Sequence, residues 1–287
     1  SSIADLDAAN PAAAEVWFNI AHAEDYTPLF EALKKRKIDV GLHFWGALPD
    51  GTWMNIAYPD SNLINHSLKF MRDTIKIAAR YGFSYVNIHP GCQAKVAIDF
   101  EHESFRLLSN PVDLHTSESL FIENAIDLSE YAKALNIVFT VETVPLRVTS
   151  GWYDIQARLH PMNIYELPVE SIISASEHGL WVANDFVHTS ANKITDTAID
   201  VWKYLKVTTE KLAPTTRLIH LGFLLPPYNG TDFHDMLDNP LLETDQAVPN
   251  KKQMMDLLQI FNNRDDVWII TEPKTDHVKN YFLAKAI

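Results

Sequence analysis

The sequence predicts a (β/α)8 TIM barrel whose first strand is short, irregular or truncated. Short apolar runs rich in strand-forming residues alternate with segments of helical spacing along the chain, a pattern typical of βα units around a parallel sheet. With only nine glycines and no GxGxxG turn, the chain lacks the usual signal of an open doubly wound sheet. Its 287 residues suit one barrel, so we expect a single domain over residues 1–287.

Seven apolar runs are the expected strands, because they combine β-branched and aromatic residues over lengths typical of buried strands. They are residues 14–19, 38–44, 84–89, 137–142, 179–185, 217–223 and 267–272. An eighth strand would close the barrel. Either residues 1–3 are the remnant of a first strand or that strand is irregular.

The segments between these runs are expected to be helices, since apolar residues recur in them three or four positions apart. Leu68, Met71, Ile75 and Ala78 mark one such helix, and Met254, Leu257, Leu258 and Phe261 mark another. Three connections are much longer than the roughly two to six residues of an ordinary βα loop. These connections, residues 91–117, 143–168 and 222–249, all follow a predicted strand, at the barrel end where active sites are built.

Composition narrows the kinds of molecule that the protein is expected to bind and the compartment in which it is expected to occur. The net charge of −13 disfavours nucleic acid, which usually binds a basic face, although bound cations could offset an acidic pocket. No apolar run is long enough to span a membrane, and the first residues lack a secretory signal. A single cysteine, Cys92, excludes an internal disulfide framework and fits a reducing compartment. We therefore expect a cytoplasmic protein without a membrane partner; the sequence leaves the oligomeric state open.

Imidazoles and carboxylates gather where the predicted strands end. These side-chain types together suit zinc, manganese or iron. The candidate metal ligands are His43, His89, Glu142, Asp185, His188, His220, Asp232, His234 and Glu272.

Each of these residues alone has an ordinary structural explanation. A lone histidine at a strand end is more often a hydrogen-bonded structural residue, and Asp185 is well placed as a helix N-cap. Glu142 and Glu272 are harder to explain in this way, because a carboxylate at the end of a covered parallel strand is costly unless it is paired or metal-bound. So many acids and imidazoles around one barrel mouth, with few basic residues in the same runs, favour bound cations.

The order of these residues resembles the xylose-isomerase-like TIM-barrel superfamily, and within it the endonuclease IV (AP endonuclease) family. The most specific motif is VNIHPG at residues 86–91. The Glu of VETV, the D-x-x-H of DFVH, the His of IHLGF, the D-x-H of TDFH and the Glu of TEP follow in the same order. The resemblance spans residues 14–275, and His43 takes the place of the family's first histidine ligand.

The resemblance implies a site of two or three zinc ions held by the nine candidate ligands. Glu142 would bridge two ions, with His43 and His89 on one side. A second ion would have Asp185, His220 and Glu272 as ligands, and a third His188, Asp232 and His234. Gly222-Phe223 stands where the family has Asn-Asp, and the loops after His43 and Glu142 differ from the family's DNA-facing segments. DNA is therefore disfavoured as the substrate, and a small phosphoester is expected.

Sugar isomerases and epimerases of the same superfamily are the alternative. They use one manganese or magnesium ion, matched here by Glu142, Asp185, His220 and Glu272, and would bind a sugar. Glu142 and Glu272 are the expected catalytic residues under both hypotheses: they position the attacking water in the hydrolase, or exchange a proton on opposite faces of the sugar in the isomerase. A non-catalytic sugar- or metal-binding barrel is a second alternative.

Four residues in or near the mouth loops are expected to bind substrate. Trp45 and Trp152 would stack on a ring, and Arg158 and Lys274 would pair with phosphate. Ordinary loop packing explains each of these residues equally well.

Overall fold

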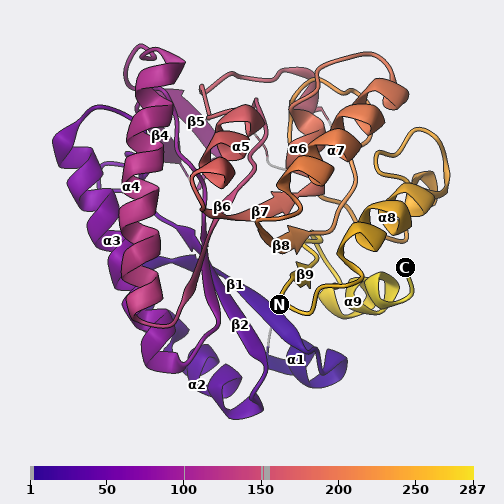
Figure 1. Ribbon diagram of the computed structural model, residues 1–287, viewed down its shortest axis with the longest axis horizontal. Coiled ribbons are helices and arrows are strands. Elements are labelled where there is room, and N and C mark those ends of the chain that lie inside the picture. The colour runs from indigo at the N-terminus through magenta and orange to yellow at the C-terminus, as the bar shows by residue number, and fades with distance from the viewer. Residues whose placement is uncertain (1–2, 100, 150, 152–155) are drawn as a thin grey trace.

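A seven-stranded parallel sheet forms the centre of the computed structural model, which describes residues 3–99, 101–149, 151 and 156–287. The strand order is β1-β2-β3-β6-β7-β8-β9. The strands are β1 (Ala13–Asn19), β2 (Asp39–Trp45), β3 (Tyr85–Ile88), β6 (Val138–Glu142), β7 (Trp181–Asp185), β8 (Thr216–His220) and β9 (Trp268–Ile270). Because the edge strands β1 and β9 contact each other, the sheet curls into a nearly closed barrel with helices around it (Figure 1). The predicted α/β barrel is confirmed.

Helices connect successive strands and cover the outside of the sheet (Figure 1). They are α1 (Ile3–Ala9), α2 (Thr27–Arg36), α3 (Ser61–Tyr81), α4 (Leu114–Ala134), α5 (Val169–Glu177), α6 (Phe186–Ala191), α7 (Ala198–Leu212), α8 (Lys251–Leu258) and α9 (His277–Lys285), with 3-10 turns at Ile20–Tyr26, Ala157–Leu159, Pro240–Glu243 and Gln259–Phe261. Helix α3 is typical: the Asp60 side chain caps its first turn, and Gly82 ends it with a φ of 71°. Its predicted apolar face is buried. No helix in the described ranges combines the length and the apolar character that a membrane span needs.

Two parts of the chain differ from the sequence-based expectation. Residues 1 and 2 lie outside the described residues, and Ile3 begins helix α1, which packs against α9. The run of alanine, leucine and aspartate after Ile3 explains this, because it lacks the β-branched residues that favour strands. The long connection 91–117 contains an antiparallel hairpin of β4 (Val96–Asp99) and β5 (Ser104–Leu107). Strand β8 pairs directly with β9. The organisation of the chain as a single domain stays a prediction.

A glycine makes room for an aromatic side chain inside the barrel. Gly41 in β2 lies in register with Tyr85 in β3, and a Cβ atom on Gly41 would stand 2.0 Å from Tyr85 Cζ. Tyr85 is fully buried and stacks on Trp268 of β9, with ring centroids 4.7 Å apart. Because Gly41 has no side chain, the Tyr85 ring can occupy the space next to it inside the barrel.

We expect Gly41→Ala to destabilise the fold, because overpacking a buried site costs roughly 1–3 kcal/mol or more. Thermal or urea unfolding of the variant measures the loss. In a Tyr85→Leu background the same substitution should cost much less, since the clashing ring is gone. Equal costs in the two backgrounds would contradict the proposed contact.

Candidate metal centre

The carboxyl ends of the strands bring all the predicted ligands to one end of the barrel. His43 lies in β2, and β6, β7 and β8 end in Glu142, Asp185 and His220. The remaining ligands, His89, His188, Asp232, His234 and Glu272, follow these strands in loops or at the start of α6. A cavity of about 680 Å³ opens over them. Parallel strands place their carboxyl ends at one edge, which explains the convergence.

Glu142 lies at the centre of this group and is fully buried. Its Oε1 is 3.1 Å from His188 Nδ1 and 3.2 Å from His220 Nδ1, and its Oε2 is 3.3 Å from His43 Nε2. The Asn87 amide donates a hydrogen bond to Oε2. Imidazoles thus surround a carboxylate that burial would otherwise make costly.

The first ligand group consists of His43, His89 and Glu142. The Nε2 atoms of the two histidines are 3.2 Å apart, and His89 Nε2 is 3.9 Å from Glu142 Oε1. Ligands of one zinc ion at about 2.0–2.2 Å lie roughly 3.0–3.5 Å from one another. The group therefore has the spacing of one side of a coordination shell.

The second ligand group consists of Glu142, Asp185, His220 and Glu272. His220 Nδ1 is 3.6 Å from Asp185 Oδ2 and 3.4 Å from Glu272 Oε2. Asp185 serves two functions at once. Its Oδ1 caps helix α6 by accepting from the His188 N–H at 2.8 Å, whereas its Oδ2 is buried and makes no hydrogen bond. Both explanations that the sequence offered for Asp185 fit the structure.

The third ligand group consists of His188, Asp232 and His234, in and opposite helix α6, and Asp185 completes it. His188 Nε2 and His234 Nε2 are 3.4 Å apart, and Asp232 Oδ1 is 3.5 Å from the first and 3.0 Å from the second. Asp185 Oδ2 also reaches this group, at 3.9 Å from His234 Nε2. The other ring nitrogen of His188 is 2.8 Å from the Thr143 carbonyl oxygen. Such an outer contact fixes a histidine ring for metal binding through its free nitrogen.

Strong coupling between acids and imidazoles shifts the pKa values at this site. Burial lowers the pKa of His43, but Glu142 and neighbouring carboxylates outweigh this and raise it to about 10. Burial also opposes protonation of His234, yet Asp232 raises its pKa to about 9. Burial and neighbouring imidazoles lower the pKa of His89 to about 3. Protonated rings thus balance the carboxylates, and a bound cation would replace those protons.

Buried side-chain atoms without a hydrogen bond indicate that these residues fit a divalent metal. Five buried atoms of the candidate ligands make no hydrogen bond to any residue that the structure describes, a costly arrangement for polar groups. They are His43 Nδ1, His89 Nδ1, Asp185 Oδ2, His220 Nε2 and Asp232 Oδ1. The two carboxylate oxygens among them support a metal, because they face histidine nitrogens across 3.0–3.9 Å. His43 Nδ1 and His220 Nε2 instead face Glu15 Oε1, at 3.2 and 3.0 Å. Oxygen and imidazole donors at these spacings suit zinc or manganese.

The expected substrate residues occupy different environments. Trp45 lines the cavity beside Trp53, with ring centroids 5.1 Å apart. Trp152 lies outside the described residues. Arg158 is buried away from the cavity wall, and its Nη2 donates to the Leu225 carbonyl at 2.8 Å. Lys274 is exposed and also does not line the cavity.

Arg158 instead supports the loop that carries Asp232 and His234. Besides its bond to Leu225, its guanidinium donates to Thr231 Oγ1 at 3.3 Å and lies 4.3 Å from the ring centroid of Phe233. Its backbone carbonyl accepts from the side chain of Asn229 at 2.7 Å. These contacts hold the residues on either side of Asp232, so Arg158 fixes the position of the third ligand group.

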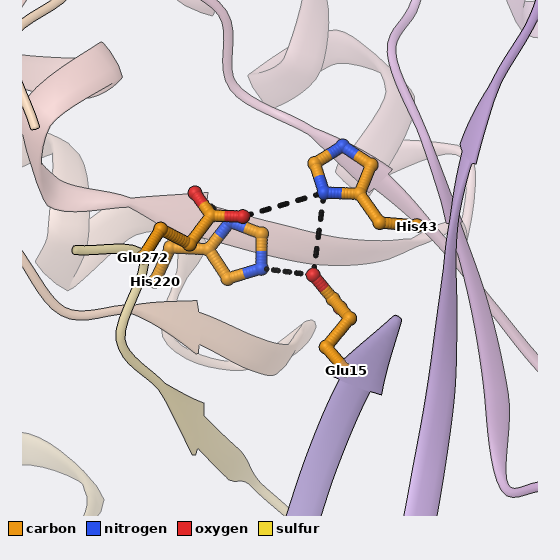
Figure 2. A group of neighbouring side chains, drawn as sticks. All are labelled: Glu15, His43, His220 and Glu272. Carbon is orange, nitrogen blue, oxygen red and sulfur yellow. Dashed lines mark ion pairs between the residues drawn. The ribbon is translucent and has the colours of Figure 1, made fainter. Parts of the chain in front are cut away.

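Sequence reasoning missed two buried acids. Glu15 in β1 joins His43, His220 and Glu272 in a fourth ligand group (Figure 2). A single acid within an apolar strand was the available signal, since the argument used for Glu142 applies equally to it. Glu166 lines the cavity wall, and burial raises its pKa to about 8. It lies in a long loop, and no motif marks it.

The comparisons with known proteins agree with this architecture. No family model matches the chain. A probable endonuclease 4 from Thermosipho africanus is 28% identical over 129 residues, which are 45% of this chain and 43% of that protein; the chain thus matches less than half of that relative's length. A D-tagatose 3-epimerase-like structure has a TM-score of 0.62 at 15% identity, covering 96% of this chain and 87% of the other. Endonuclease IV from Thermus thermophilus has a TM-score of 0.54 at 15% identity, covering 99% and 90%.

The chain shares its TIM-barrel fold with these structures and with a xylose isomerase-like TIM barrel protein from Mycobacterium smegmatis. Solved structures of this fold include both enzyme classes that the sequence resemblance named, sugar epimerases and endonuclease IV. The fold alone therefore does not decide between them. The ligand groups distinguish the two classes better, because a one-metal site and a multinuclear site need different numbers of histidines.

We expect Arg158→Met to weaken the third ligand group of this barrel. Leaving the buried Leu225 carbonyl without its charged donor costs about 1.5–3 kcal/mol, and the loop that carries Asp232 loses its support. Metal content and thermal unfolding measure both effects. Arg106→Met, at an exposed position, is the control and should change neither. An Arg158 variant with full metal content and unchanged stability would contradict the assignment.

We also expect Glu166→Gln to change how the stability of the metal-free protein depends on pH. The folded-state pKa of Glu166, about 8, lies above the unfolded value, so its favourable contribution is present below about pH 4.5 and is lost as pH rises towards 8. Glutamine does not titrate. Its stability advantage over glutamate should therefore grow between pH 5 and pH 8, as measured by urea unfolding. A constant difference across this range would contradict the prediction.

Proposed function

We propose that this chain is a hydrolase whose multinuclear divalent-metal site is formed by the three ligand groups above, and that it cleaves a small phosphoester rather than DNA. The observation that carries the proposal is the presence of two ligand groups beyond the one that a single metal would need. His43 and His89 form one with Glu142, and His188 and His234 form the other with Asp185. These histidines would have no role in a one-metal enzyme. Zinc, as two or three ions, is the metal we propose.

The chain's own residues divide the work of such a hydrolase. Bound divalent cations supply charge that stabilises a phosphoryl group and lowers the pKa of a water molecule. Glu142 is fully buried, so its role is to hold the first two groups together. The Glu272 side chain is 26% exposed and lines the cavity. Glu272 is therefore the carboxylate placed to orient a water molecule and to accept its proton.

The walls of the cavity support a small substrate with few negative charges. None of its described lining residues is a lysine or an arginine, and aromatic side chains form one side. A polyanion such as DNA would need basic contacts along its backbone. A single phosphate over the ligand groups would not need such basic contacts, because bound cations would neutralise its charge.

A sugar isomerase or epimerase with one manganese or magnesium ion is the second candidate. The group Glu142, Asp185, His220 and Glu272 is complete without the other histidines, which favours this candidate, as does the likeness to an epimerase-like structure. It requires Glu142 and Glu272 to exchange a proton with the substrate. The complete burial of Glu142, which does not line the cavity, weakens this role.

Metal content distinguishes the two candidates. We expect protein purified without chelator to hold two or three zinc ions, and His89→Ala and Asp232→Ala each to lower that content. Hydrolysis of bis(p-nitrophenyl) phosphate should fall roughly 100-fold or more in both variants, since each lost ligand removes transition-state charge stabilisation. His66→Ala, at an exposed position on α3, is the control. One manganese or magnesium ion, unaffected by either substitution, would refute the hydrolase and support the isomerase.

A further inference from the structure

Glu15 contacts two of the candidate ligands with a single oxygen atom. Its side chain rises from β1 between His43 and His220 (Figure 2). The Oε1 atom is 3.2 Å from His43 Nδ1 and 3.0 Å from His220 Nε2. Both contacts are ion-pair distances, and neither ring nitrogen has a hydrogen bond of regular geometry to any described residue, Glu15 included. Glu15 borders the cavity, but its side chain is only 4% exposed, so it meets these rings away from solvent.

The opposite nitrogens of the same two rings face the ligand groups. His43 Nε2 is 3.2 Å from His89 Nε2 and 3.3 Å from Glu142 Oε2. His220 Nδ1 is 3.2 Å from Glu142 Oε1. A neutral imidazole carries its proton on one nitrogen and its lone pair on the other. Whichever nitrogen donates to Glu15 therefore leaves the other one free to bind a metal.

We propose that Glu15 is a positioning residue that holds His43 and His220 in opposite tautomers. His43 carries its proton on Nδ1 and offers Nε2 to the first ligand group. His220 carries its proton on Nε2 and offers Nδ1 to the second. A carboxylate that accepts the outer N–H of a metal-binding histidine fixes the ring and strengthens it as a ligand. Here one oxygen does so for two rings and thereby couples two ligand groups.

The alternative is that Glu15 is itself a ligand, together with His43, His220 and Glu272. A metal there would take the lone pairs of His43 Nδ1 and His220 Nε2. Each ring would then carry its proton on the nitrogen that faces Glu142, and two groups would lose a ligand. If Glu15 only accepts the outer N–H groups of the two rings, all three ligand groups keep their histidine nitrogens. Glu272 Oε1, 3.4 Å from His43 Nδ1, is the competing acceptor, but its carboxylate also serves the second group.

The barrel interior holds Glu15 in place. Glu15 lies in register with Gly41, which in turn lies in register with Tyr85. The Tyr85 ring occupies the space that Gly41 leaves, and burial together with the nearby Glu15 charge raises the pKa of its hydroxyl. Rigid strands and a packed ring thus support the carboxylate, as precise ligand geometry requires.

Two variants and a control test this inference, which rests on the proposed metal centre but not on the phosphoester substrate. Glu15→Gln keeps an acceptor oxygen without the charge, and Glu15→Leu removes both. Chelator competition on the zinc-loaded protein should show affinity lowered roughly 10-fold by glutamine and 100-fold by leucine, with the number of bound ions unchanged. Glu103→Gln, which removes another cavity carboxylate outside the ligand groups, should change nothing.

The second readout is the tautomer of each ring, from long-range ¹H–¹⁵N spectra of zinc-loaded protein with labelled histidine. We expect the Nδ1–H form for His43, the Nε2–H form for His220, and loss of both fixed forms in Glu15→Leu. If that variant does not fold, unchanged zinc affinity in Glu15→Gln overturns the proposal. Identical tautomers, loss of a whole ion, or absence of zinc binding in the unsubstituted protein also overturn it. Zinc binding with these tautomers but without phosphoester hydrolysis would refute only the proposed function.

Discussion

A carboxylate buried among imidazoles is the constraint on which the rest of this barrel end depends. Glu142 has no access to solvent, and an isolated ionised group in that position would cost several kcal/mol or more. Histidines from three other strands or their loops approach its two oxygens. Each of them is in turn paired with a further acid, so the charges form a connected network. Removing one member therefore changes the electrostatic environment of several others.

Strand residues form one part of this network, the lower level, and residues in loops and in α6 form the other part, the upper level. The lower level consists of Glu15, His43, Glu142 and His220. Glu15 lies close to the buried Tyr85. The upper level consists of His188 in α6 and of Asp232 and His234 in a loop, and the groups that support it are not candidate ligands. Arg158 fixes the loop around Asp232, and the Thr143 carbonyl orients His188. Asp185 links the levels, because it both starts helix α6 and faces the ligand groups.

The sequence predicted the strands and the convergence of imidazoles and carboxylates at one barrel end, because both follow from local rules. An apolar run ending in a polar residue marks the carboxyl end of a buried strand, and parallel strands bring those ends together. The hairpin of β4 and β5 was missed, although Val96 and Ile98 alternate with other residues, since a hairpin inside a βα connection breaks the pattern. Arg158 was assigned to substrate from its charge and loop position. Its contacts with Leu225 and Phe233 are long-range, and no local pattern reveals them.

The separation of the ligands along the chain has a consequence for biosynthesis. In the second ligand group, Glu142 ends β6, whereas Glu272 follows β9. The second ligand group therefore cannot be complete until β9 has left the ribosome and docked between β8 and β1. Until then the emerging chain carries several unneutralised histidines and acids with no coordination shell. A metal held by this group would therefore bind only after β9 has docked, and without metal that strand would close over an uncompensated centre.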